Sequence, residues 1–363
     1  MNFFVHYLAP LCISIVIAIL GLWIGRKLGL MDKPGNDLKN TRKPVPTMQG
    51  IFVYLGFMAI VGICFPSIFH NAIFRWLFIW SLPIVVVEFI EELNYIGKIK
   101  YKVPPVLRLL AHIAAGFLAI YIGHFGAQEL IIWTWKWLIP QWIFAIFFVL
   151  RSILCINAIN RFDGIYAQAS GVSSVWFLTI FLLIQFVVFG HYTVFTPENL
   201  QILLTVKYLS RILFVISLVS SFVEFKPLGL VRDIGIMFYG FALAYLSVVG
   251  WAKIGTLIVA LSLVIFDAIR VWLRRIFRAK KSPLNGDYTH LHHRLMGLGW
   301  KRKEIRVFVR LRSLFMMILI LLQWTARINK LIIFLMMALV FFGINYYLFG
   351  VKKLPCGLQI KKD

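Results

Sequence analysis

The stretch VHYLAPLCISIVIAILGLWIG (Val5–Gly25) contains no Asp, Glu, Lys or Arg and is followed directly by the basic pair Arg26 and Lys27. An apolar run of about 20 residues is long enough to cross the hydrocarbon core of a bilayer as a helix. The whole chain shares this character, because 61% of its 363 residues are hydrophobic and its mean hydropathy is +0.86. A soluble domain typically has about 45–50% apolar residues. The sequence therefore predicts an integral membrane protein.

Similar apolar runs recur along the chain, and we expect about eleven of them to span the membrane as helices. They lie near residues 5–25, 49–66, 70–90, 105–124, 140–158, 169–190, 200–222, 234–250, 252–273, 307–325 and 329–349. A Trp-rich segment, QELIIWTWKWLIP (Gln128–Pro140), is shorter and fits an interfacial piece better than a span. The predicted fold is an all-α polytopic transmembrane helical bundle, and we treat residues 1–363 as one domain.

The distribution of Lys and Arg predicts the orientation of this bundle. With eleven spans, the basic residues fall in alternate loops and in the C-terminal tail, whereas the loops near Pro66 and Gly190 are nearly free of them. Basic loops favour the cytoplasm, so we expect the N-terminus outside and the C-terminus in the cytoplasm, in the inner (plasma) membrane. The net charge of +24 would also suit a nucleic-acid-binding protein. Basic cytoplasmic loops account for it, and no nucleic-acid partner is expected.

Most of the 14 Asp and Glu residues lie in the loops predicted to be cytoplasmic, near residues 26–48, 91–104, 157–168, 223–233 and 274–306. An acidic site that faces phosphates requires a cation, and Mg²⁺ is usually held by one or two carboxylates together with substrate phosphates. The candidates for such a site are Glu91, Glu92, Asp163 and Asp233. The alternative is that they are ordinary loop charges that balance nearby Lys residues.

The string HLHHRL (His290–Leu295) places three His within four residues. Together with Arg294, these side chains could contact a phosphate and the hydroxyls of a sugar. A structural zinc site would need a fourth ligand at suitable spacing, and no Cys lies nearby. An incidental polar loop is the remaining alternative. The pattern favours sugar-phosphate contact.

A membrane transporter or lipid flippase is the alternative class of protein. Such proteins place ionisable groups inside the membrane along the path of the substrate. Here the acidic residues and His concentrate at one rim, while the interiors of the spans are largely apolar. The exceptions are Arg75, Arg108, Arg151, Arg211 and His112, which we expect near helix ends or between helices. This distribution favours an enzyme that acts at the cytoplasmic surface.

The cytoplasmic loops together resemble those of the polyprenyl-phosphate N-acetylhexosamine-1-phosphate transferases, which are relatives of phospho-MurNAc-pentapeptide translocase. DKP (Asp32–Pro34) and PVPTMQG (Pro44–Gly50) are similar to the first loop of that family. NAINRFDG (Asn157–Gly164) resembles its NxxNxxDG, and RDIG (Arg232–Gly235) resembles the loop with its metal-binding Asp. SPLNGDYTHLHHRLMGLGW (Ser282–Trp300) resembles its sugar-recognition loop.

The resemblance implies a reaction in which polyprenyl (undecaprenyl) phosphate accepts a sugar 1-phosphate from UDP-N-acetylhexosamine and UMP is released. This would be the first membrane step of a cell-envelope polysaccharide pathway. The lipid phosphate oxygen would attack the phosphorus nearest the sugar, and Mg²⁺, or Mn²⁺ in its place, would stabilise the developing charge. The resemblance leaves both the identity of the hexosamine and a homodimer open.

The resemblance also implies roles for individual residues. Asp233 and Asp163 would be metal ligands, and Glu91, Glu92, Asp163 and Asp32 would be the catalytic carboxylates. The substrate-binding residues would be Asn157, Asn160, Asp287, His290, His292, His293 and Arg294.

The chain departs from the family pattern at several of these positions. The usual adjacent Asp pair is Glu91–Glu92, and Gln49 stands where Gly is common. The family's MGDxGS is VRDIGI here, so Arg232 replaces a Gly and Ile236 replaces a Ser. The second acidic residue of DGxDGLAxG is missing from DGIYAQASG (Asp163–Gly171).

Overall fold

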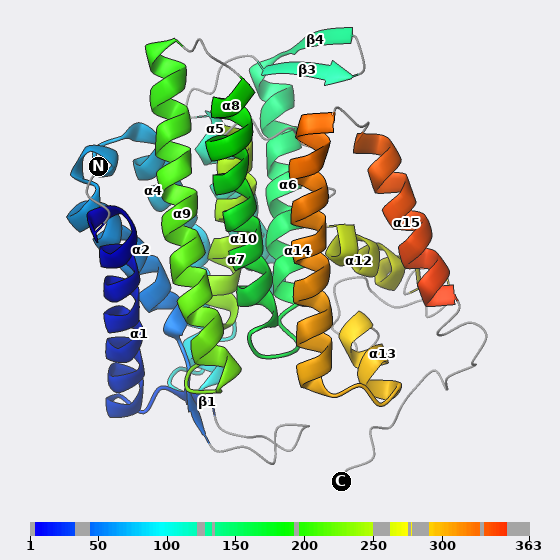
Figure 1. Cartoon of the computed structure of the whole chain (residues 1–363). Coiled ribbons are helices and arrows are strands. Elements are labelled where there is room, and N and C mark those ends of the chain that lie inside the picture. The colour runs from blue at the N-terminus through cyan, green and yellow to red at the C-terminus, as the bar shows by residue number, and fades with distance from the viewer. Residues whose placement is uncertain are drawn as a thin grey trace.

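The computed structural model describes residues 4–32, 44–121, 128–132, 135–191, 196–249, 262–274, 277, 290–326 and 330–346. It is a bundle of helices (Figure 1). The first half contains α1 (Ala9–Lys27), α2 (Gln49–Cys64), α3 (Pro66–Phe69), α4 (Ala72–Tyr95), α5 (Pro105–Tyr121), α6 (Gln141–Arg161) and α7 (Gln168–Leu182). The second half contains α8 (Phe189–His191), α9 (Pro197–Phe225), α10 (Arg232–Val249), α12 (Ser262–Arg274), α13 (Leu291–Gly297), α14 (Arg302–Ala326) and α15 (Lys330–Tyr346). Two π-helical segments, Phe4–Leu8 and Leu183–Val188, adjoin α1 and α7.

Each of the eleven expected ranges contains one of these helices, although part of the range 252–273 lies outside the described residues. Within the described part of the chain, six helices are long and apolar enough to cross a membrane. They are α1, α4, α6, α7 with its extension to Phe186, α9 and α10. Helices α2 and α5 are shorter apolar helices. The prediction of an all-α polytopic membrane protein is confirmed at this level.

Two short antiparallel strand pairs interrupt the helical pattern. Strand β1 (Met31–Asp32) pairs with β2 (Val45–Pro46), and β3 (Gln128–Ile132) pairs with β4 (Trp135–Ile139). The second pair is the Trp-rich segment, which the sequence analysis did not predict to be extended, although its Ile and Trp content suits strands. Figure 1 shows β3 and β4 at the end of the bundle opposite β1 and α13.

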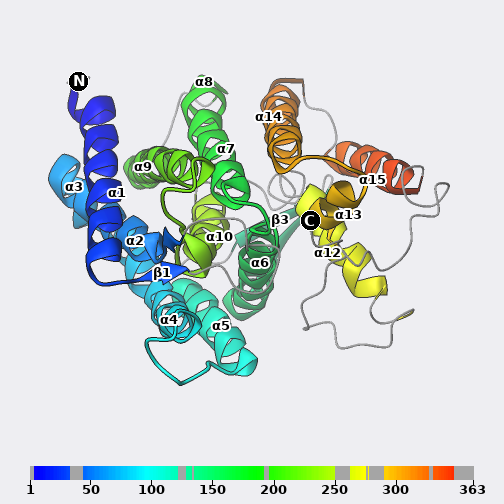
Figure 2. The same ribbon diagram turned by 90° about the horizontal axis from the view of Figure 1, so that it is seen from below.

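Helix α10 forms the centre of the bundle. Figure 2, which looks along the bundle from the end that carries β1, shows α10 surrounded by α2, α4, α6, α7 and α9. Nearly every residue of α10 after Asp233 is buried, as expected for a helix that is apolar on all sides. Gly240 permits the close approach of α6, because an added Cβ would lie 2.6 Å from the Cα atom of Ile156. The central helix is therefore held in a fixed register, and its first residues lie at the end near β1.

The charged residues that interrupt the apolar runs lie near helix ends or between helices, as predicted. Arg75 and Arg108 lie in the first turns of α4 and α5. Arg151, in the middle of α6, donates from Nη2 to the hydroxyl of Ser247 on α10 at 2.6 Å. Arg211 lies over several aromatic rings, including that of Tyr7 at 4.6 Å from the ring centroid.

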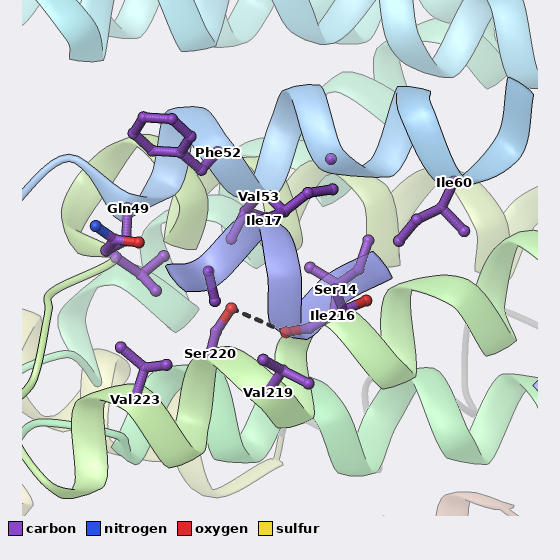
Figure 3. A pocket seen from close by; sticks show the side chains of 13 residues that line it. Ser14, Ile17, Gln49, Phe52, Val53, Ile60, Ile216, Val219, Ser220 and Val223 are labelled. Carbon is purple, nitrogen blue, oxygen red and sulfur yellow. Dashed lines mark hydrogen bonds between the residues drawn. The ribbon is translucent and has the colours of Figure 1, made fainter. Parts of the chain in front are cut away.

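A mainly apolar crevice lies between α1, α2 and α9 (Figure 3). Gln49 lines one end of it, and Ile17, Val53 and Val219 are among its apolar walls. The hydroxyl of Ser220 donates to the carbonyl of Ile216 at 2.8 Å rather than to the crevice.

Candidate active site

The backbone of the PVPT segment brings the first loop against the start of α10. The carbonyl of Pro46 accepts a hydrogen bond from the Leu230 amide at 2.9 Å, and the Gln49 amide donates to the Leu230 carbonyl at 3.0 Å. On its other side, the Thr47 amide donates to the Leu30 carbonyl at 2.9 Å. Residues 30–32, 45–49 and 230–233 are therefore held side by side, although they are far apart in the sequence.

Two glycines allow α2 and α10 to cross closely at this point. A Cβ added at Gly50 would lie 2.7 Å from the Val231 carbonyl oxygen, and one added at Gly235 would lie 2.9 Å from the Cα atom of Gly50. No other side chain fits at either position without moving the backbone. The glycines of MQG and RDIG thus place Arg232 and Asp233 beside the first loop.

Arg232 is the centre of a first ion-pair network. Its Nε atom lies 3.1 Å from the Glu92 carboxylate, and its Nη1 atom lies 3.7 Å from Asp32. Its guanidinium also lies over the ring of Tyr95, 3.9 Å from the centroid, and the Tyr95 hydroxyl donates to Asp32 at 3.0 Å. Glu92 accepts a further hydrogen bond from the Thr47 hydroxyl. Two carboxylates that the sequence analysis selected, Asp32 and Glu92, are both buried here around one guanidinium.

Arg108 is the centre of a second network. Its Nε and Nη2 atoms donate to the two oxygens of Glu88 at 2.8 and 2.6 Å, which is the bidentate geometry that guanidinium groups favour. The same Nη2 atom donates to Asp233 at 2.8 Å. Glu88 was not among the site residues predicted from the sequence. The sequence feature that indicates its role is its position one helical turn before Glu92 in VEFIEEL, which places both carboxylates on one face of the helix.

Asp163 lies in the turn that follows α6, where its amide donates to the Asn160 carbonyl at 2.9 Å. Burial, followed by the nearby carboxylates of Glu224 and Asp233, raises the pKa of Asp163 well above its usual value. The side chain of Asn157 is turned back to its own helix, because its Nδ2 atom donates to the Ile153 carbonyl at 2.9 Å. Negative charge is therefore concentrated around Asp163.

Glu224 is a buried carboxylate that the sequence analysis also missed. One of its oxygens accepts from the Ser170 hydroxyl at 2.5 Å, and the other accepts from the Val231 amide at 2.9 Å. It therefore joins the end of α9 to the start of α7 and to the segment that leads into α10. Its signal in the sequence was its position at the end of an otherwise apolar run, shortly before RDIG.

The His-rich loop is anchored by Asp267 of α12, a third residue missed from the sequence. The Oδ2 atom of Asp267 lies 2.9 Å from Nδ1 of His290, and its Oδ1 atom accepts from the Leu291 amide at 3.0 Å. Arg270 donates to the same carboxylate at 3.0 Å. A carboxylate that fixes the ring orientation of a His in this way is a common second contact in active sites.

His292 connects the His-rich loop to the Asp163 loop. A Cβ added at Gly164 would overlap the His292 ring, lying 2.5 Å from its Cε1 atom. The rings of His292 and His293 have centroids 4.1 Å apart. Burial, followed by the neighbouring His293, lowers the pKa of His292 to about 3, so its ring is neutral at physiological pH. Neither ring nitrogen of His292 has a hydrogen-bond partner within the described residues.

The remaining predicted site residues are placed as follows. Glu91 accepts a hydrogen bond from the Val103 amide at 2.9 Å, so it holds the loop after α4 and makes no ion pair to Arg232 or Arg108 within the described residues. Asn160 is partly buried at the end of α6, and Arg294 is partly buried in α13. Asp287 lies outside the described residues.

Within the described residues, no group of three or more His, Cys, Asp or Glu side chains is arranged to hold a metal ion by itself. Asp163 and Asp233 could still contribute to a metal site that substrate phosphates complete, because Mg²⁺ commonly takes only one or two protein carboxylates.

Comparison with known proteins identifies the relatives of this chain. No model of a protein family matches it. It is 24% identical over 307 residues to the probable undecaprenyl-phosphate N-acetylglucosaminyl 1-phosphate transferase of Bacillus subtilis, covering 81% of this chain and 77% of that protein. It is 23% identical over 333 residues to the undecaprenyl-phosphate alpha-N-acetylglucosaminyl 1-phosphate transferase of Escherichia coli K12, covering 89% and 84%. The corresponding Salmonella typhi protein is 24% identical over 305 residues, covering 82% and 77%. These similarities confirm the predicted resemblance to the polyprenyl-phosphate N-acetylhexosamine-1-phosphate transferases.

The structure shows how the departures of this chain from the family pattern are accommodated. The two residues of the Glu91–Glu92 pair make different contacts: Glu92 pairs with Arg232, and Glu91 accepts a hydrogen bond from the Val103 amide. Arg232 has a φ of +53°, a conformation that Gly adopts freely and other L-residues rarely adopt. Ile236 is fully buried in the central helix. The replacement of Gly by Arg thus retains the backbone turn and adds a cation to the site.

Proposed function

We propose that this transferase moves N-acetylhexosamine 1-phosphate from a UDP-sugar to undecaprenyl phosphate and releases UMP. Its relatives carry the names of undecaprenyl-phosphate N-acetylglucosaminyl 1-phosphate transferases, which supports both the lipid acceptor and the sugar 1-phosphate donor. The observation that carries the proposal is the meeting of Glu92, Asp163 and Asp233 with two arginines at the end of the bundle near β1.

Phosphoryl transfer needs positioned charge more than covalent chemistry from the protein. Arg232 and Arg108 place guanidinium groups beside the carboxylates, where incoming phosphates would be attracted. The lipid phosphate oxygen attacks the phosphorus nearest the sugar, so a bond forms between that oxygen and phosphorus while the bond to UMP breaks. Glu92 and Asp32, held by Arg232, are proposed to orient the lipid phosphate or to accept its proton.

The residues present fit the Mg²⁺ ion that the family resemblance implies. Burial, followed by the nearby carboxylates of Glu224 and Asp233, raises the pKa of Asp163, and a divalent cation would favour its ionised form. Asp163 and Asp233 would hold the ion, with substrate phosphates as the other ligands. When bound, Mg²⁺ or Mn²⁺ would supply stabilisation of the charge that develops on the transferred phosphate.

The His-rich loop is proposed to contact the sugar and its phosphate. Asp267 fixes His290, and the packing of His292 on Gly164 places the loop beside Asp163. Asn157, Asn160, Asp287, His293 and Arg294 are proposed as further substrate contacts.

The proposed setting is the inner membrane with the active site facing the cytoplasm, where UDP-sugars are made. The basic loops support this orientation, with about eleven spans, the N-terminus outside and the C-terminus inside. The reaction would open a cell-envelope polysaccharide pathway. A homodimer remains compatible with this arrangement.

The proposal is tested by incubating the purified protein with undecaprenyl phosphate, Mg²⁺ and a panel of UDP-sugars and measuring UMP. We expect UMP release with at least one UDP-N-acetylhexosamine and none without the lipid. Movement of a lipid or sugar across proteoliposomes without UMP release would instead support the transporter or flippase alternative.

A further inference from the structure

The start of α10 carries an unusual combination of backbone and side chain. Among the described residues, Met48, Ala167 and Arg232 are the non-Gly residues with positive φ, and each lies at the start of a helix that borders the site. Arg232 is the first residue of α10 and has φ +53°. Such a conformation is unfavourable for a residue with a Cβ atom and persists only where other interactions stabilise it.

The guanidinium group of Arg232 makes contacts that can offset the cost of this conformation. It contacts Glu92 on α4 through Nε at 3.1 Å, and it lies 3.7 Å from Asp32 in the first loop through Nη1. It also lies over Tyr95, which is itself hydrogen-bonded to Asp32. The Arg232 side chain therefore connects three separate segments: the first loop, the end of α4 and the start of α10.

We propose that Arg232 is a positioning residue of the transfer reaction. Its guanidinium fixes Glu92 and Asp32 relative to Asp233, which follows it directly in the chain and is held from the other side by Arg108. The inference rests on the proposed function, because it assigns Arg232 to the same site. A positive charge alone would not suffice for this role. The guanidinium uses its planar fork to contact the carboxylates and its face to stack on Tyr95.

The test compares Arg232→Lys, Arg232→Gly and Tyr95→Phe with a control, Lys226→Ala. Lys keeps the charge but loses the fork and the stacking geometry. Gly removes the side chain while allowing the same backbone conformation without strain. Tyr95→Phe removes the hydroxyl that donates to Asp32 and retains the ring beneath the guanidinium. Lys226 is an exposed residue at the end of α9, and within the described residues no side-chain hydrogen bond or ion pair joins it to the site.

We expect Arg232→Gly to lower kcat by about 10²-fold or more, because a misplacement of about 1 Å in an active site can have an effect of that size. The KM values for the UDP-sugar and for the lipid should change much less than kcat. Arg232→Lys should recover only part of the loss, Tyr95→Phe should lower kcat less than either, and Lys226→Ala should match the wild type. The melting temperature in detergent should fall in Arg232→Gly, because the buried Glu92 and Asp32 lose their cation even though Gly relieves the backbone strain. It should stay close to that of the wild type in the other three variants, which retain the charge at position 232.

A wild-type kcat in both Arg232 variants would overturn the inference. So would a loss of activity in Arg232→Gly that follows its loss of thermal stability, if Arg232→Lys stays fully active. If Arg232→Gly does not fold, Arg232→Lys decides the question alone, because it preserves the charge and the native backbone. Failure of the proposed function is recognised separately, since the wild-type protein would then release no UMP from any UDP-sugar.

Discussion

Asp233 and Glu88 are bound to the same guanidinium: the Nη2 atom of Arg108 lies 2.8 Å from Oδ2 of Asp233 and 2.6 Å from Oε2 of Glu88. The three residues come from α10, α5 and α4, so the pairing depends on the packing of three helices. It leaves Asp233 at the edge of the network, one-third exposed, while Glu88 is fully buried. Glu88 thus holds Arg108, and Arg108 orients Asp233.

Replacing Glu88 by Gln should lower the thermal stability of the protein. Gln keeps one acceptor but removes the charged, bidentate partner of Arg108, which then retains only its ion pair with Asp233 among the described residues. A hydrogen bond to a charged group is worth about 1.5–3 kcal/mol, so we expect a loss of stability of that order. Thermal unfolding in detergent measures it, with Glu198→Gln at the exposed start of α9 as a control. An unchanged melting temperature in Glu88→Gln would contradict the proposed role.

Gly164→Ala should reduce turnover by about 10²-fold, because the new Cβ would occupy the space of the buried His292 ring and displace the His-rich loop. Gly190 provides a matched control: a Cβ added there meets no atom within 4 Å, so Gly190→Ala should behave like the wild type. UMP release by both variants checks the prediction. Equal rates for Gly164→Ala and Gly190→Ala would show that the contact with His292 does not matter for transfer.

The two members of the Glu91–Glu92 pair should respond differently to substitution. Glu92→Gln should lower kcat by about 10²–10⁴-fold, the usual range for a positioned acid–base group, whereas Glu92→Asp keeps the carboxylate and should cost less. Glu91→Gln should have a small effect, because Glu91 accepts only the Val103 amide among the described residues and Gln can still accept it.

Turnover measured at low and high salt separates this account from simple charge balance. Charge balance predicts small effects at both positions that weaken further as salt screens the loop. Near-normal turnover in Glu92→Gln would remove Glu92 from the chemistry and leave the site to Asp163 and Asp233.

Asp267→Asn should impair use of the UDP-sugar rather than of the lipid. Asn can still accept from the Leu291 amide, but it loses the charge that orients His290. Loss of a carboxylate that orients a metal-bound His typically costs about 10–100-fold, and we expect an effect of this size at Asp267. We therefore expect a higher KM for the UDP-sugar or a lower kcat, with the KM for undecaprenyl phosphate nearly unchanged. Equal effects on both substrates would argue against a role of this loop in sugar recognition.

The helices and the acidic face could be predicted from the sequence because both depend on local patterns. Long apolar runs mark helices wherever they pack, and the motifs around Asp163 and Asp233 are contiguous strings. The secondary structure of the Trp-rich segment could not be predicted, because a short apolar run suits a strand and an interfacial helix equally. Only the register of Gln128 with Ile139 identifies it as a hairpin.

The partners within the site could not be predicted, because they depend on how the helices are rotated and packed. Arg108 and Asp233 are 125 positions apart, and nothing in either neighbourhood indicates their contact. Glu224 and Asp267 lie in or beside apolar runs, where a single carboxylate gives no sign of what it binds. The separate orientations of Glu91 and Glu92 likewise follow from the position of α4 beside Arg232.

The most direct measurement follows the phosphorus of the donor. Purified protein is incubated with Mg²⁺, undecaprenyl phosphate and a UDP-N-acetylhexosamine labelled at the phosphorus nearest the sugar, beside an Asp233→Asn variant. Sugar 1-phosphate transfer moves the label into the lipid product and leaves unlabelled UMP, and the variant, which keeps the fold but loses the carboxylate, should form almost none. Label that remains in UDP, or an Asp233→Asn variant as active as the wild type, would contradict the account.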